Sequence, residues 1–251
     1  MHKLFDLTDR IALVTGSSRG IGRAIAEGYV AAGARVVVNG RDEKALAAAA
    51  KEIGPNAVAV PFDASDRAAG EAAVARIEKE IGPIDILVNN AGMQKRGAFI
   101  DYPEEDWRLI IATNLDSVFF LSQSVARRML PRGRGKIVNI CSVMSELGRA
   151  TIAPYTASKG AVKMLTKAMC AEWGKHNIQA NGISPGYFGT ELNTALMADE
   201  TFSAWVRART PAGRWGKVEE LQGAAIFLAS DASSFVNGNI IFVDGGMTAV
   251  V

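Results

Sequence analysis

Short apolar runs alternate with longer amphipathic stretches along most of this chain. The runs are rich in Ile and Val, which is typical of strands that are covered on both faces of a parallel sheet. The stretches between them repeat apolar residues at helical spacing, as helices do when one face packs on a core. We therefore predict an α/β fold, with strands over residues 11–14, 35–38, 57–60, 84–88, 136–141, 178–184 and 239–246.

The predicted helices lie between these strands, and several end at glycine or at Gly-Pro pairs. Residues 187–216 differ, because they are polar, contain glycines and are interrupted by Pro211. We expect them to form a mobile substrate lid with one or two helices on a single domain that spans residues 1–251. The clearest helical patterns cover residues 43–53, 103–129 in two segments around Asn114, 154–173 and 218–229.

A glycine-rich turn connects the first predicted strand to the first helix. Its spacing is G-x-x-x-G-x-G, and a second buried strand follows the helix, so the unit is strand, turn, helix, strand. Glycines let the backbone approach a pyrophosphate, and a helix N-terminus supplies free N–H groups and positive potential. This arrangement predicts a dinucleotide site. The candidate contacts in the turn are Gly16, Ser18, Arg19, Gly20, Ile21 and Gly22.

The end of the second strand indicates which dinucleotide binds. NAD-binding proteins usually place an acid there, whereas an arginine suits the 2′-phosphate of NADP. This strand ends in Asn39-Gly40-Arg41, and Asp42 is expected to cap the next helix. With Arg19 nearby, two guanidinium groups beside a pocket that we expect to lack acids favour NADP. Two solvated arginines are the alternative.

Other strand ends supply further candidates for the same edge of the sheet. Asp63 and Ala64 follow the third strand, where the carboxylate could contact an adenine or cap a helix. The small residues Asn90, Ala91 and Gly92 follow the fourth strand and would let a flat ligand lie against the backbone. Asn89 is expected to bond neighbouring strands.

Basic residues continue beyond the fourth strand. Lys95 is expected to be a solvated loop charge, whereas Arg96 is a candidate anchor for a substrate carboxylate, because ligands of open α/β sheets bind outside the strand ends.

The chemistry is concentrated between residues 142 and 159. Tyr155 and Lys159 are four residues apart, so on a helix their side chains share one face. A nearby ammonium stabilises a tyrosinate, and a tyrosine so paired can exchange a proton with an alcohol or a carbonyl. Ser142, at the end of the fifth strand, could bond the same oxygen. A surface Tyr–Lys pair is the alternative.

Composition excludes several other classes of protein. The 28 basic and 26 acidic residues give a net charge of +2, which indicates no attraction to nucleic acid or membrane surfaces. With two histidines, His2 and His176, a histidine-based hydrolase is improbable, and no residue cluster indicates a metal site. His2 is expected in a mobile start and His176 at a helix end, and both cysteines are expected to be unpaired. Without an apolar run of membrane-span length or a signal-peptide core, we expect a cytoplasmic protein.

Together, the motifs resemble the short-chain dehydrogenase/reductase family over essentially the whole chain. The resemblance implies a doubly wound Rossmann-type α/β fold, a seven-stranded, mostly parallel sheet with helices on both faces, and usually a homotetramer. The matching stretches are Thr15-Gly16-x-x-x-Gly20-Ile21-Gly22, Asn89-Asn90-Ala91-Gly92, Asn114, Ser142, Tyr155-x-x-x-Lys159 and Pro185-Gly186.

The resemblance also implies a role for each catalytic residue. Tyr155 would be the general acid/base, and Ser142 would position the substrate oxygen. Lys159 would lower the pKa of the tyrosine and hold the nicotinamide ribose, and Asn114 would hold a water in a proton relay. Thr190, which follows Pro185 and Gly186, would contact the nicotinamide carboxamide.

Four stretches match more closely a branch of the family that interconverts a sugar acid and its keto form with NADP(H). An anionic substrate needs a cation, and Arg96 and Arg149 both flank the expected site. Gln94, Glu146 and Asn193 could meet sugar hydroxyls. The stretches are residues 39–41, 94–96, 139–147 and 210–216.

Three alternative functions are also compatible with the sequence. A 3-oxoacyl-carrier-protein reductase would need an open channel and a cationic patch for its acidic carrier. A 2-dehydro-3-deoxygluconate 5-dehydrogenase would more often use NAD, which Gly40-Arg41 disfavours. A non-catalytic NADP-sensing protein would usually lack Tyr155 or Lys159.

Overall fold

Seven strands form one sheet in the computed structural model, which describes residues 3–251. The strand order is β3-β2-β1-β4-β5-β6-β7, and every neighbouring pair is parallel. The order changes direction between β1 and β4, which is where ligands bind in open α/β sheets. The strands are β1 (Ile11–Val14), β2 (Arg35–Val38), β3 (Ala57–Ala59), β4 (Ile86–Asn89), β5 (Gly135–Ile140), β6 (Ile178–Pro185) and β7 (Ile240–Val243).

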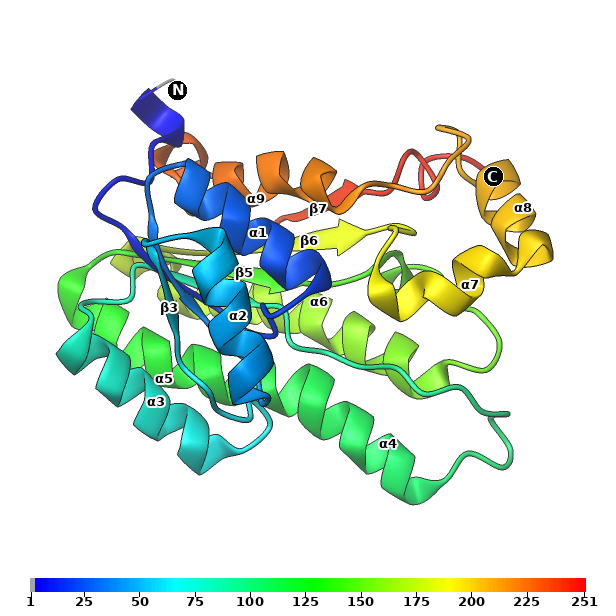
Figure 1. The fold of residues 1–251 in the computed structure, drawn as a ribbon, viewed down its shortest axis with the longest axis horizontal. Helices are drawn as coiled ribbons and strands as arrows, with labels where there is room; N and C mark the ends of the chain where they lie inside the picture. The colour runs from blue at the N-terminus through cyan, green and yellow to red at the C-terminus, as the bar shows by residue number, and fades with distance from the viewer. Residues whose placement is uncertain (1–2) are drawn as a thin grey trace.

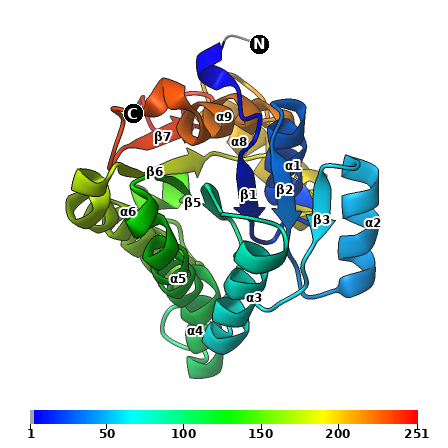
Figure 2. The ribbon, with the colours of Figure 1, turned by 90° about the vertical axis from the view of Figure 1, so that its left-hand side faces the viewer.

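Two layers of helices cover the sheet (Figure 2). Successive strand residues alternate between them: Val36 and Val38 face one core, and Val37 faces the other. Burial on both faces explains why these strands consist of uninterrupted apolar runs. One layer contains α1 (Gly20–Ala31), α2 (Glu43–Ile53) and α9 (Gln222–Ala229), and the other contains α3 (Arg67–Glu80), α5 (Ser117–Arg132) and α6 (Ala153–Trp173).

Most predicted boundaries agree with the structure to within a few residues, and β7 is the clearest exception. Its expected range, 239–246, is too long because the strand ends at Val243. Asp244 begins a turn there, since its carboxylate accepts hydrogen bonds from the N–H groups of Gly246 and Thr248. Asp42 caps α2 as predicted, accepting from the Ala45 N–H at 3.0 Å.

Residues 104–132 form one long helix rather than two separate ones. It consists of α4 (Glu104–Ile111), a π-helical segment (Ala112–Asp116) and α5. Among the described residues, this is the one helix that is long and apolar enough, by length and composition alone, to cross a membrane. Half of the most apolar stretch of this helix is buried in the fold, as is typical of a core helix. The helix is therefore weak evidence for a membrane span.

The carboxyl ends of the strands point toward the segment that contains α7 (Thr194–Ala198) and α8 (Glu200–Arg209) (Figure 1). The predicted site residues therefore meet at this edge. His176 lies in a 3-10 turn directly after α6, in agreement with the predicted helix end, and Cys141 and Cys170 are both free. The expectation for His2 lies outside the described residues.

Candidate active site

Ser142 lies at the end of β5, where the chain leaves the sheet and turns toward α6. Its hydroxyl accepts the Met144 N–H at 3.1 Å and so caps a short 3-10 turn, Val143–Ser145. The Ser145 hydroxyl accepts the Ser142 N–H at 3.3 Å and donates to the Lys159 carbonyl at 2.9 Å. These bonds fix the end of β5 against the first turns of α6, which contain Tyr155 and Lys159.

Tyr155 is half-buried, and its hydroxyl shares a hydrogen bond with Ser142. Burial raises the pKa of Tyr155, Cys141 and Tyr187 add to the shift, and the bond with Ser142 opposes it. The direction is opposite to the lowering that the sequence suggested, because burial outweighs the hydrogen bond with Ser142. Tyr155 therefore keeps its proton at neutral pH, and the protonated phenol is the form that can act as a proton donor to a carbonyl oxygen.

Lys159 is buried on the same face of α6. Its Nζ donates to the Ile140 carbonyl at 2.7 Å and lies 5.8 Å from the centre of the Tyr155 ring. Burial lowers the pKa of Lys159 to about 8. The ammonium is therefore hydrogen-bonded to the end of β5. Among residues 3–251, it makes no hydrogen bond to the Tyr155 hydroxyl.

Asn114 lies fully buried in the π-helical segment. Its side-chain oxygen accepts the Met93 N–H at 2.8 Å, and its amide donates to the Met93 carbonyl at 2.9 Å and to the Ser158 hydroxyl at 3.2 Å. A Cβ added to Gly92 would lie 3.4 Å from the Asn114 oxygen and 3.7 Å from the Lys159 nitrogen. The end of β4, Asn114 and Lys159 therefore meet at one point.

The glycine turn after β1 is open at Gly20 and tightly packed at Gly22. Gly20 has a φ of +59°, and a Cβ there would meet only Thr190, at 4.0 Å. At Gly22 a Cβ would lie 2.4 Å from the Asn90 amide, so the turn packs tightly on the end of β4. Within the described part of the chain, the Arg19 side chain does not cap α1, which leaves its first N–H groups for a ligand.

Asparagine side chains hold this turn in place. The buried Asn39 amide donates to the carbonyls of Val60 and Phe62, and its oxygen accepts the Gly16 N–H at 3.3 Å. Asn90 donates to the Thr15 carbonyl at 2.8 Å and to that of Gly16 at 3.0 Å. Both side chains therefore hydrogen-bond to protein backbone and fix the shape of the glycine turn.

Ala91 and Asn89 are also fixed to neighbouring groups. The Ala91 N–H donates to the Thr15 hydroxyl at 3.0 Å. The Asn89 amide donates to Asn139 on β5 at 2.8 Å, which agrees with its predicted role between strands.

The region around Arg41 contains an acid, so the expectation of an acid-free pocket is wrong. Arg41 lies 3.9 Å from Asp63, and Arg19 lies 3.5 Å from Glu191. Burial alone would raise the pKa of Asp63, but hydrogen bonds from Ser65 and the charge of Arg41 hold that pKa below its ordinary value. Both pairs are loose, and the Arg41 side chain is 78% exposed, so its guanidinium is free to turn to a ligand. Ala64 packs instead against the core around α3 and α5.

The strand end after β6 borders the glycine turn. Pro185 pairs with Val243 of β7, and the Gly186 N–H donates to the Val243 carbonyl at 3.0 Å. A Cβ on Gly186 would lie 2.8 Å from Asp244, so only glycine fits. Thr190 lies next to Gly20, since a Cβ added to that glycine would meet its side chain at 4.0 Å, and it closes this side of the site.

A pocket opens beside Ser142 and Tyr155. Arg96 and Arg149 both line it, as do Gln94 and Asn193. The remaining wall comes from Val143, Met144, Ile152, Gly186, Tyr187 and Leu196. The sequence did not single out Tyr187, although its place directly after the Pro185-Gly186 strand end was an available signal.

The two arginines give this pocket its charge. Burial and the neighbouring Arg149 lower the pKa of Arg96. Arg149 donates to the Tyr187 hydroxyl at 2.8 Å and lies over the Phe202 ring. Among residues 3–251, neither arginine makes an ion pair with a carboxylate, whereas Lys95 pairs with Asp106 and Glu146 with Lys163. The pocket therefore has positive charge to offer to an anion.

The sequence is similar to those of known reductases and dehydrogenases. A family model described as enoyl-(acyl carrier protein) reductase matches residues 16–248. Gluconate 5-dehydrogenase of Gluconobacter oxydans (strain 621H) is 56% identical over 248 residues, which cover 98% of this chain and 97% of that protein. The 5-keto-D-gluconate 5-reductase of Escherichia coli (strain K12) is 52% identical over 254 residues and the full length of both chains.

A solved structure is also similar throughout. It is a gluconate 5-dehydrogenase from Burkholderia cenocepacia J2315 in complex with NADP and tartrate, which is 55% identical. The two superpose with a TM-score of 0.97 over 99% of each chain.

Proposed function

The chain belongs to the short-chain dehydrogenase/reductase family, and we propose that it interconverts D-gluconate and 5-dehydro-D-gluconate with NADP(H). One observation carries the choice of substrate: Arg96 and Arg149 line the pocket that Ser142 and Tyr155 share. A sugar acid presents one carboxylate and one reacting carbonyl, and this pocket offers a cationic side and a proton donor. The similarity of the chain to gluconate 5-dehydrogenase and to 5-keto-D-gluconate 5-reductase supports the same assignment.

The reaction assigns a task to each side chain. Arg96 holds the substrate carboxylate, and Ser142 and Tyr155 both bond the C5 carbonyl oxygen. NADPH supplies the hydride when it is bound, and Tyr155 gives its proton to the oxygen. Lys159, a water molecule and Asn114 then return a proton from solvent to Tyr155.

The residues that would hold NADP(H) surround the glycine turn and the neighbouring strand ends. Arg19 and Arg41 would meet the 2′-phosphate, because planar guanidinium groups bind phosphate oxygens in pairs. The full set is Gly16, Ser18, Arg19, Gly20, Ile21, Gly22, Asn39, Arg41, Asp63, Ala64, Asn90, Ala91, Gly92, Tyr155, Lys159, Pro185, Gly186 and Thr190. Of these, Asn39 and Asn90 act through the backbone that they position.

Residues 187–216 form the lid of this single-domain, cytoplasmic enzyme, which works as a homotetramer. The exposed apolar side chains Phe119 on α5 and Met164 on α6, together with the chain end near Val250, are the proposed subunit contacts. Light scattering on the purified protein tests the tetramer, and a monomer would contradict it.

Initial rates of NADPH oxidation test the function. Purified protein is assayed with 5-dehydro-D-gluconate, and in parallel with NADH in place of NADPH and with an acetoacetyl thioester in place of the sugar acid. Fast turnover confined to the sugar acid with NADPH supports the proposal. Turnover of the thioester indicates an acyl-carrier-protein reductase instead, and NADPH binding without turnover of any carbonyl indicates a nucleotide-sensing protein.

A further inference from the structure

We infer that Tyr187 is a positioning residue for substrate specificity: its hydroxyl and the Phe202 ring hold the Arg149 guanidinium in the pocket, where it binds the substrate carboxylate beside Arg96. This inference rests on the proposed function and adds a residue that acts through Arg149.

The first support is the set of groups that surround Arg149. The Tyr187 hydroxyl accepts from the guanidinium at 2.8 Å, and the ring of Phe202 lies 5.1 Å below it. Both contacts come from neutral groups, which orient a guanidinium without neutralising it. A carboxylate in either place would cancel the charge that a substrate acid needs.

The second support is the close packing of the aromatic side chains around Tyr187. Tyr187 packs edge-on against Phe202, Trp205 and Trp215, with ring centres 5.6, 5.8 and 5.6 Å away. The Trp215 indole donates to the Ser203 hydroxyl at 3.1 Å, which fixes the cluster to α8. Such interlocked rings have few alternative rotamers, so the tyrosine hydroxyl has a defined position.

The third support is the connection between the two arginines. The Gly97 N–H, next to Arg96, donates to the Thr151 carbonyl, two residues after Arg149, at 3.0 Å. This hydrogen bond joins the two loops, and both guanidinium groups line one pocket. Two like charges held together repel each other, and an anion between them relieves this repulsion. The carboxylate affinity of the pocket thus depends on α8 through Tyr187.

The test compares Tyr187→Phe with the wild-type enzyme on two substrates. 5-Dehydro-D-gluconate has the carboxylate, and L-sorbose is the same carbon skeleton with a neutral hydroxymethyl group in its place. Phenylalanine keeps the ring cluster and removes only the hydroxyl. Because a hydrogen bond to a charged group contributes about 1.5–3 kcal/mol, we expect the KM for the acid to rise by roughly 10-fold or more with little change in kcat. The kcat/KM for L-sorbose and the KM for NADPH should not change.

A double-mutant cycle separates positioning from an independent contact. Arg149→Lys keeps the charge and loses the planar group, so it should also raise the KM for the acid. If Tyr187 acts through Arg149, the variant with both substitutions will be no worse than Arg149→Lys alone. Multiplicative losses, an unchanged KM for the acid in Tyr187→Phe, or equal losses on both substrates would overturn the inference.

A matched control removes a tyrosine hydroxyl elsewhere. Tyr29 is buried in α1, and its hydroxyl donates to the Ala225 carbonyl at 3.1 Å. Tyr29→Phe should lower stability without changing the KM for the acid. If the wild-type enzyme does not reduce 5-dehydro-D-gluconate at all, the proposed function fails. If it does and Tyr187→Phe behaves like wild type, only the inference about Tyr187 fails.

Discussion

The ammonium of Lys159 donates a 2.7 Å hydrogen bond to the backbone carbonyl of Ile140, the last residue of β5. This contact joins the helix that contains Tyr155 to the strand that leads to Ser142. It fixes the position of Tyr155, the proposed proton donor, relative to Ser142. It also places the charge beside the strand end, which accounts for a tyrosine whose pKa is raised by burial and not lowered by its neighbour.

The rate of reduction is expected to fall as the pH rises through about 8. Burial lowers the pKa of Lys159 to about 8, so its ammonium is charged below this pH and neutral above it. Tyr155 keeps its proton over the same range, because burial raises its pKa. If the relay returns protons through Lys159, kcat/KM for 5-dehydro-D-gluconate should lose about 10-fold per pH unit above this value.

The measurement is kcat/KM at fixed ionic strength across neutral and alkaline pH. The Lys159→Arg variant is the control, because a guanidinium stays charged throughout this range. Any activity that it retains should lack the step near pH 8. A wild-type profile that stays flat through pH 8, or a step that persists in the arginine variant, would show that Lys159 does not supply the proton.

Tyr155→Phe removes the proposed proton donor without removing its ring. A positioned acid/base contributes about 10²–10⁴-fold, so kcat should fall by that factor. The dissociation constant for NADPH, measured by fluorescence titration, should remain close to that of the wild type. Tyr29→Phe, in which the lost hydroxyl lies in the core, should keep its kcat. Residual turnover of Tyr155→Phe near wild type would contradict the assigned role.

Much of this architecture could be predicted from the sequence, because its signals are local. Buried parallel strands appear as apolar runs, as at β1 and β2, and an Asp before a helical pattern predicts a cap, as at Asp42. Residues at strand ends were expected to converge, since parallel strands place their carboxyl ends at one edge. At this edge Ser142 interacts with Tyr155, and Gly92 lies beside Asn114 and Lys159.

The features that escaped prediction depend on distant contacts. The pKa of Tyr155 follows from how deeply α6 packs, which spacing alone does not give. Asp63 approaches Arg41 because β2 and β3 are paired, although the two residues are well separated in sequence. Tyr187 reaches Arg149 through the packing of α8, and no local pattern encodes that contact.

Arg41→Ala should weaken the preference for NADP. Arg41 is mostly exposed and only loosely paired with Asp63, so its guanidinium is available for a 2′-phosphate. Because a hydrogen bond to a charged group contributes about 1.5–3 kcal/mol, the KM for NADPH should rise by roughly 10-fold or more. The KM for NADH, which has no 2′-phosphate, should not change. Arg108→Ala, which removes an exposed arginine bonded to Glu104 on α4, is the control. Equal effects on both cofactors would assign Arg41 a structural role.

Arg96→Ala tests the first carboxylate anchor. This side chain lines the pocket and has no carboxylate partner within residues 3–251. Its loss should raise the KM for 5-dehydro-D-gluconate by roughly 10-fold to 100-fold and leave the KM for NADPH unchanged. Lys95→Ala removes the adjacent charge, which is already paired with Asp106, and should behave like wild type. If both variants lose substrate affinity equally, the loop responds to its total charge and Arg96 has no specific contact.

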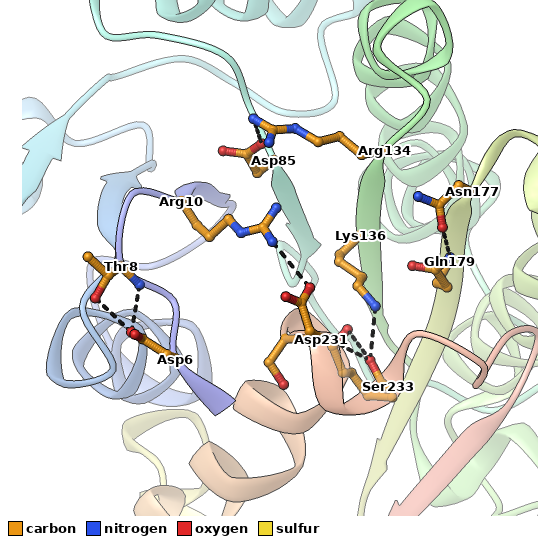
Figure 3. Close-up of polar contacts among 12 residues, drawn as sticks. Asp6, Thr8, Arg10, Asp85, Arg134, Lys136, Asn177, Gln179, Asp231 and Ser233 are labelled. Atoms are coloured by element: carbon orange, nitrogen blue, oxygen red, sulfur yellow. Dashed lines mark hydrogen bonds and ion pairs between the residues drawn. The ribbon is translucent and has the colours of Figure 1, made fainter. Parts of the chain in front are cut away.

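Lys136 lies at the opposite edge of the sheet, among the polar residues shown in Figure 3. It is 9% exposed, and its Nζ donates to the Ser233 hydroxyl at 3.2 Å. The neighbouring carboxylates are engaged elsewhere, Asp231 with Arg10 at 3.1 Å and Asp85 with Arg134 at 3.0 Å. Burial lowers the pKa of Lys136 from 10.5 to about 8, and the charge of Asp231 only partly opposes the shift.

Lys136→Met should therefore stabilise the fold at neutral pH, with a gain that fades in alkali. Between about pH 8 and pH 10.5 the unfolded chain binds a proton that the folded lysine does not, so the wild-type free energy of unfolding rises with pH in this window. Below it the buried charge costs up to about 3 kcal/mol, less whatever the lost contact with Ser233 contributed. Urea denaturation at neutral pH and at the alkaline end of this pH range measures the difference in the free energy of unfolding. The control is Lys44→Met, on the exposed face of α2, which should change this free energy little at either pH. A methionine variant that is less stable than wild type at neutral pH would mean that Asp231 compensates the ammonium fully, and that the charge at this edge supports the fold.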